Sequence, residues 1–125
     1  MQDRKHNDSA ENPTLLELVL QVQGEFRRSL EPIRVTPLQA GMILYLQRHV
    51  DANVKDAAAA LCLSVPTVSR VVKDLVRKRW VTKRRSVTDT RAVCLSLSRQ
   101  GQALARKIAE RVRAVRSDLI RKAGA

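Results

Sequence analysis

The stretch SVPTVSRVVKDLVRKR, residues 64–79, predicts one helix with two chemically different faces. Ser64 is a good N-terminal capping residue, and Pro66 fits the first helical turn. When the helix is wound at about 100° per residue, one side is aliphatic and holds Val68, Val71, Val72 and Leu75. The other side and its flanks hold Pro66, Thr67, Ser69, Arg70, Lys73 and Arg77. Such a helix packs on a core by one face and offers a basic face outward.

A shorter helix is predicted directly upstream, over 54–61, with Asn53 as its cap and four consecutive alanines inside it. A short helix, a tight turn and a Ser-capped helix describe a helix-turn-helix, whose second helix enters the DNA major groove by its N-terminal part. Arg70 can then bond guanine. The hydroxyls of Thr67 and Ser69 can bond bases or phosphates, and the later Lys73 and Arg77 meet phosphates. The alternative is an ordinary helical hairpin with a solvated outer face.

The next segment predicts a cationic β-hairpin, with strands over 80–84 and 93–97 and a turn over 86–90. Val93, Leu95 and Leu97 alternate with Ala92, Cys94 and Ser96, which is the period of a half-buried strand. A hairpin beside such a helix is a wing that reaches phosphates or the minor groove. The candidate contacts are Lys83, Arg84 and Arg85 for phosphates and Arg91 for the minor groove. Asp89 can hold Arg91 by a hydrogen-bonded pair or act as a turn former, and both roles can hold at once.

Amphipathic helices are also predicted at the two ends of the chain. The first, over 13–30, starts with Asn12 and Pro13, and the last, over 99–122, follows Ser98 as its cap. Apolar side chains at helical spacing give the candidate dimerisation residues Leu15, Val19, Val22, Leu104, Ile108, Val112, Val115 and Leu119. These stripes need a partner, which a second chain can supply. The alternative is that the two helices pack on each other within one chain.

The predicted fold class is mainly α with a small β-hairpin, a winged helix-turn-helix flanked by N- and C-terminal dimerisation helices. Thr36, Pro37 and Gln39 predict the remaining helix start through a capping box. We expect residues 1–11 to be a polar flexible tail and 12–125 to form a single domain, in which 37–97 is the DNA-binding lobe.

The net charge of +12 is concentrated in the second half of the chain. Residues 1–63 carry seven Lys or Arg against eight Asp or Glu, 64–91 carry nine against two, and 92–125 carry eight against two. Concentrated positive charge attracts nucleic acid or anionic membrane, although a solvated face gives the same pattern. The last helix lacks Trp and Phe, which argues against a basic membrane-surface protein. A winged-helix module that binds RNA or protein is the other rival.

Catalytic and metal-binding motifs are missing from the sequence. The two His and two Cys are widely spread, and no Gly-rich phosphate loop or nucleophile elbow occurs. We therefore expect no enzyme activity, no metal and no cofactor. The polar N-terminus is no signal peptide, and no apolar run approaches the roughly 20 residues that cross a bilayer. Two cysteines form no disulfide framework, so a cytoplasmic location fits.

Three stretches resemble the MarR family of bacterial transcription regulators: TPLQAGMILYLQ, SVPTVSRVVKDLVRKRWV and TDTRAVCLSLSRQG. The wing ends in Asp89-Thr90-Arg91, and a Ser/Thr-x-x-Gly helix start follows at 98–101. The resemblance covers about residues 14–120. It implies a homodimeric repressor or activator, held by its first and last helices on a palindromic operator with half-sites ~34 Å apart. It also implies a small aromatic or phenolic effector in a cleft between the dimer and DNA-binding parts.

The resemblance further implies glycine at two turns, where this chain has Cys62 and Arg79. A non-Gly residue in the left-handed conformation costs about 1–2 kcal/mol. Either that strain exists here or the local turns differ. We interpret Cys62 and Cys94 as small apolar residues of the turn and the strand rather than as redox sensors.

Overall fold

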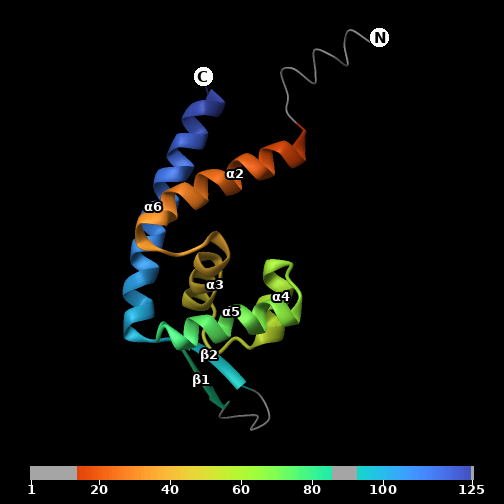
Figure 1. The fold of residues 1–125 in the computed structure, drawn as a ribbon, viewed down its shortest axis with the longest axis vertical. Helices are drawn as coiled ribbons and strands as arrows, with labels where there is room; N and C mark the ends of the chain where they lie inside the picture. Colours follow the sequence, from red (N-terminus) through yellow and green to blue (C-terminus); the bar gives the residue numbers. More distant parts are fainter. Residues whose placement is uncertain (1–13, 86–92, 125) are drawn as a thin grey trace.

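The computed structural model describes residues 14–85 and 93–124, with side chains described as far as Arg116. Its elements are α2 (Leu15–Leu30), η1 (Glu31–Ile33), α3 (Pro37–Arg48), α4 (Val54–Leu61), α5 (Val65–Arg77), β1 (Val81–Arg85), β2 (Val93–Leu97) and α6 (Arg99–Gly124). In Figure 1, α6 rises from the hairpin along one side of the molecule, and α2 crosses it far from the hairpin. The remaining helices and the hairpin form the lower lobe. The predicted class, mainly α with one hairpin, is confirmed.

Side-chain caps start the helices where the sequence predicts them. Thr36 and Gln39 close a capping box, with both N–H to oxygen distances at 3.1 Å. Asn53 closes a second box at the start of α4, as its amide oxygen accepts the Asp56 N–H at 2.8 Å. The Ser64 hydroxyl accepts the Thr67 N–H at the start of α5. Each cap satisfies backbone donors that helix ends leave unpaired, and this fixes where α3, α4 and α5 begin.

The bounds of four elements differ from the predictions by one or two residues, and one of them is α6, which runs to Gly124 rather than to 122. Helix α2 starts at Leu15, where the Thr14 hydroxyl accepts the Glu17 N–H; the expected start at Asn12 and Pro13 lies outside the described residues. Helix α5 ends at Arg77 rather than 79, because the chain turns left-handed just beyond it. Strand β1 is shifted by one residue, to Val81–Arg85.

The core is aliphatic and lies where α3, α4, α5, the hairpin and α6 meet. Its fully buried large side chains are Leu30, Met42, Ile43, Val68, Val72, Leu75, Val81, Leu95 and Ile108. Among the residues with described burial, no polar or charged residue is buried. The core therefore fixes α5 by its aliphatic face, and the basic face of that helix has to point outward.

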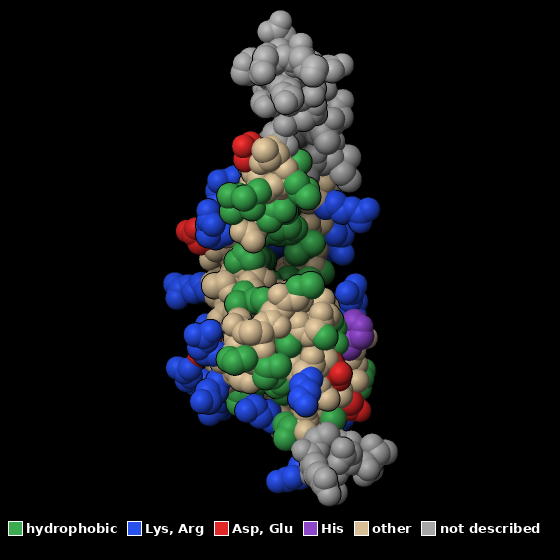
Figure 2. Space-filling model, turned by 90° about the vertical axis from the view of Figure 1, so that its right-hand side faces the viewer, with side chains coloured by type: hydrophobic (Ala, Val, Ile, Leu, Met, Phe, Trp, Pro, Cys, Tyr) green, Lys and Arg blue, Asp and Glu red, His purple; other side chains and the backbone are tan. Residues whose placement is uncertain are grey.

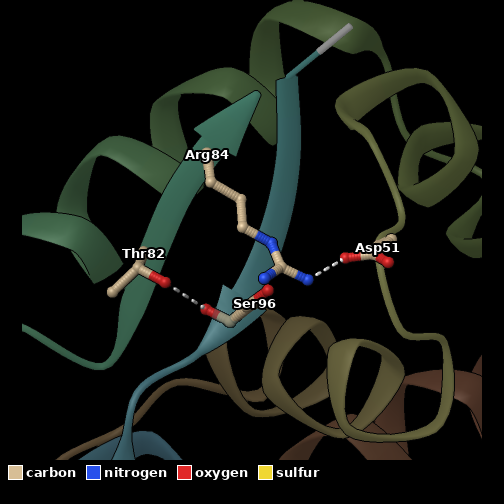
Figure 3. A network of polar contacts seen from close by, with 4 residues as sticks. All are labelled: Asp51, Thr82, Arg84 and Ser96. Carbon is tan, nitrogen blue, oxygen red and sulfur yellow. Dashed lines mark hydrogen bonds and ion pairs between the residues drawn. The ribbon is translucent and has the colours of Figure 1, made fainter. Parts of the chain in front are cut away.

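The hairpin is antiparallel, with its register running from Val81 opposite Leu97 to Arg85 opposite Val93. A residue of the α3–α4 connection adds to it, since Ala52 forms a bridge with Leu95 in β2. The predicted alternation of inward and outward residues in β2 is wrong at two positions: Val93 is exposed and Cys94 is buried. On the Cys94 face, the side chain of its register partner Arg84 crosses the strand (Figure 3).

The two tight turns where glycine was expected contain non-Gly residues in the left-handed conformation. The backbone strain expected at Cys62 and Arg79 therefore exists, and the turns keep the left-handed geometry that glycine would adopt. Cys62 follows α4 with φ 56°, and Arg79 follows α5 with φ 65°. Both turns show the paired hydrogen bonds of a Schellman motif. After α5, the Arg79 N–H donates to the Val76 carbonyl and the Trp80 N–H to the Leu75 carbonyl, each at 3.0 Å. Each residue is expected to cost about 1–2 kcal/mol relative to a relaxed conformation.

Candidate nucleic-acid interface

Helix α5 presents a hollow in the basic face that the sequence predicts. Pro66, Ser69, Arg70 and Lys73 line it, and all four residues are exposed. Arg70 and Lys73 form no ion pair within the described part of the chain. A face with unneutralised cations and small hydroxyl groups is suited to phosphates and base edges.

Two predicted contacts of α5 are already engaged within the helix. The Ser64 hydroxyl donates to the Thr67 hydroxyl at 2.8 Å, so these two groups are ordered together at the N-terminus. Arg77 forms an ion pair with Asp74 one turn earlier. That pair is exposed and therefore weak, but it reduces the charge that Arg77 offers a polyanion.

The hairpin extends the basic surface beyond α5. Lys83, Arg84 and Arg85 are all exposed on β1, while the predicted contacts Asp89 and Arg91 lie outside the described residues. Figure 2 shows Lys and Arg side chains gathered at the lower left of the lobe that carries the hairpin. On the face that Figure 2 shows, Lys and Arg side chains therefore gather in one region of the lower lobe, and others lie singly elsewhere on it.

The start of α6 is locked to the end of α5 and the start of β1. The Ser98 hydroxyl donates to the Arg79 carbonyl at 2.6 Å and accepts the Gly101 N–H at 3.0 Å. The Ser98 N–H donates to the Trp80 carbonyl at 3.0 Å. Gly101 has no space for a side chain, because a Cβ there would lie 2.1 Å from the Trp80 oxygen. The long helix and the helix-turn-helix therefore share one rigid junction.

Comparisons with known proteins agree with this geometry. Residues 35–92, which run from just before α3 to the residue before β2, match the model of the MarR family. Within this segment the chain is similar to the MarR family. The fold of the described residues is accordingly a winged helix-turn-helix. The search of curated proteins returned no match.

Solved structures share the fold of this chain. The repressor CouR bound to a 23-mer DNA duplex is 23% identical, with a TM-score of 0.80 over 90% of this chain and 81% of that one. The S. aureus MepR–DNA complex is 23% identical, with a TM-score of 0.78 over 85% and 79% of the two chains. Apo MarR from E. coli is 19% identical, with a TM-score of 0.78 over 86% and 84%. Sequence identities this low show that the fold is shared, and they show nothing further about this chain.

The dimerisation residues predicted from the sequence fall into different environments. Leu15 and Val19 lie on the exposed part of α2, and Val22 is half-buried. Leu104 and Ile108 are instead buried in the chain's own core. Val115 is buried and Val112 half-buried, while the side chain of Leu119 lies outside the described part.

An apolar hollow of about 250 Å³ lies between α2, α3 and α6. Its lining residues are Phe26, Leu30, Pro37, Ala40, Gly41, Leu44 and Val112, none of which is charged.

No described helix is long and apolar enough to span a bilayer. Within the same described residues, no cluster of three or more His, Cys, Asp or Glu is placed to hold a metal ion.

Sequence reasoning missed Asp51. Its carboxylate pairs with Arg84 across the hairpin, and its backbone is left-handed, with φ 62°. The sequence indicates only a break around residues 51–53, because a pairing between a turn and a strand 33 residues apart leaves no local pattern. An Asp at a break is itself a signal of a left-handed turn position, which Asp tolerates better than most residues.

Proposed function

We propose that the chain acts as a homodimeric repressor on a palindromic DNA operator, with α5 in the major groove and the wing at the minor groove. The observation that carries this proposal is the uncovered hollow of α5, where Arg70 and Lys73 flank Ser69 and no described acidic side chain pairs with either cation. Arg70 is assigned to a guanine edge, and Lys73 to a phosphate.

The wing supplies the second half of the footprint in this proposal. Lys83 and Arg85 meet the backbone beside the minor groove, and Arg91 enters that groove with Asp89 orienting it. The charge balance supports this assignment, since residues 64–91 carry nine cations and two acids. CouR and MepR, which share the fold, are described in complexes with DNA, and CouR as a transcriptional repressor.

The dimer is supported by the apolar surface of α2. Leu15 is 78% exposed and Leu16 is 68% exposed, and Leu18, Val19 and Leu20 are also uncovered. Five large apolar side chains in one turn and a half of helix form a patch that a single chain leaves in water, and such patches mark interaction sites. Since Leu104 and Ile108 are already buried within one chain, we assign the second copy to α2 and to the outer end of α6.

A small effector fits the apolar hollow between α2, α3 and α6. The lining holds an aromatic ring, Phe26, and no cation that would pair with a carboxylate. We therefore propose an uncharged aromatic or phenolic effector rather than an aromatic acid, since an acid would lose its hydration there without gaining a counter-ion.

Selection from random duplex DNA, followed by a salt titration on the selected duplex, tests the proposal. We expect a palindromic consensus and a linear fall of log K with log salt, with a slope of about −0.9 for each phosphate contacted. A control RNA of the same sequence should bind more weakly and without enrichment. Failure to enrich any duplex sequence, or equal enrichment of RNA, would reject the proposed function.

A further inference from the structure

Arg84 in β1 and Asp51 in the α3–α4 connection form an ion pair across the hairpin (Figure 3). The guanidinium Nη2 lies 2.5 Å from the carboxylate Oδ1, although both side chains are more than half exposed. Asp51 is anchored by its backbone as well: the carbonyl of the adjacent Ala52 accepts the Leu95 N–H of β2 at 2.8 Å. The pair therefore joins β1 to a fixed point of the domain.

The pair lies on one face of the hairpin, near the point where the wing leaves the body. Arg84 sits opposite Cys94 in the register, and its side chain crosses β2 to reach Asp51. On the same face the Thr82 hydroxyl donates to the Ser96 carbonyl at 3.5 Å. Arg84 is the fourth of the five residues of β1, so its position bears directly on the direction of the hairpin strands.

We propose that Arg84 is a positioning residue of the wing, held by Asp51, rather than a phosphate contact. The pair sets the angle at which the hairpin leaves the domain and withholds the Arg84 charge from DNA. This inference rests on the proposed function, because the wing angle affects binding only if the wing meets a duplex. It replaces the sequence-based assignment of Arg84 and leaves Lys83 and Arg85 as phosphate contacts.

The electrostatics favour the internal partner. The hydrogen bond with Asp51, and then the charge of that carboxylate, raise the pKa of Arg84. An arginine is charged across the working pH range, so the guanidinium remains a cation that Asp51 can hold. To reach a phosphate, Arg84 would have to give up its pairing with Asp51 and leave that carboxylate without its counter-charge. Arg70 and Lys73 face no such competition among the described residues.

The test compares Asp51→Asn, Arg84→Gln, their combination, and a charge swap that joins Asp51→Arg with Arg84→Asp. The swap is compatible with the backbone, because Arg34 and Arg79 already occupy left-handed positions in this chain. Affinity for the selected duplex is measured at several salt concentrations. Lys73→Ala serves as the matched control for the loss of one true phosphate contact, which lowers the salt slope by about 0.9.

If Arg84 positions the wing, both single variants weaken binding about two- to fivefold, as expected for one exposed pair. The double variant binds no more weakly than the single variants. The salt slope of each variant stays within about 0.3 of the parent's slope, whereas loss of a phosphate contact would lower it by about 0.9. The charge swap restores most of the affinity. The proposal is overturned if Arg84→Gln lowers the slope as Lys73→Ala does, or if Asp51→Asn binds more tightly. The proposal is also overturned if both single variants bind the duplex as tightly as the parent, or if the charge swap binds it no more tightly than Arg84→Gln does.

Amide hydrogen exchange without DNA separates this inference from the proposed function. The Leu95 amide, bonded to Ala52, should exchange several-fold faster in either single variant and recover in the swap. If the parent protein binds no duplex, the proposed function is wrong, but the exchange rates still show whether Asp51 holds the hairpin. If exchange at Leu95 is the same in all variants, Asp51 does not hold the wing, whatever the DNA measurements show.

Discussion

Replacement of Gly101 by alanine tests the junction that ties α6 to the DNA-binding lobe. An alanine Cβ would lie 2.1 Å from the Trp80 oxygen and 3.0 Å from the Trp80 carbonyl carbon, both backbone atoms. To accept it, the two backbones must separate by about an ångström, and the Trp80 carbonyl then loses its bond from the Ser98 N–H. The substitution therefore perturbs α6 and β1 together.

The magnitude follows from three contributions. Overpacking costs about 1–3 kcal/mol, and the lost hydrogen bond costs about 1 kcal/mol. Alanine in a helix gains back about 1 kcal/mol relative to glycine. The net expectation is a destabilisation of about 1–3 kcal/mol, or about 4 °C in Tm for each kcal/mol.

The assay is chemical or thermal unfolding at one fixed protein concentration, because the Tm of the proposed dimer would depend on concentration. Gly41→Ala is the matched control, since no atom lies within 4 Å of a Cβ at that helical position. It should stabilise α3 by up to about 1 kcal/mol. If Gly101→Ala is as stable as Gly41→Ala, the junction is not as tight as the structure implies, and the reasoning fails.

Further predictions concern the binding face, the wing, the dimer patch and a strained turn. Arg70→Ala should lose discrimination at one base position, by about 1–3 kcal/mol in competition assays with single-base operator variants. Arg91→Ala should weaken binding and relax the preference in A·T-rich flanks, which selection with the variant would show. Leu16→Glu should shift the protein toward monomer in analytical ultracentrifugation, since it places a charge in the α2 patch. Cys62→Gly should raise the free energy of unfolding by about 0.5–1 kcal/mol, because glycine occupies its φ of 56° without strain.

The helix starts could be predicted because their causes are local. A capping box needs only Thr36 and Gln39, three residues apart, and the structure places the cap there. The basic face of α5 could also be predicted from the sequence, because helical periodicity alone separates Arg70 and Lys73 from the buried valines. Such features depend on a few neighbouring residues, and a single sequence contains that information.

Contacts that join distant segments could not be predicted in this way. The Asp51–Arg84 pair and the Ala52–Leu95 bridge depend on how the α3–α4 connection packs beside the hairpin. Cys94 is buried on the face of the hairpin opposite Leu95 and outside the core cluster, and the period of the strand alone does not show that burial. The apolar stripe of α6 was recognised, but whether Leu104 and Ile108 face their own core or a second chain is decided by tertiary packing.

A hydroxyl-radical footprint of the protein on its selected duplex tests the central claim most directly. Two α5 helices related by a two-fold axis should protect two equivalent patches about one helical turn, ~34 Å, apart. Arg70→Ala should weaken both patches equally, because each chain contributes the same residue. A single asymmetric patch, or protection that does not depend on Arg70, would contradict recognition by a symmetric pair of α5 helices.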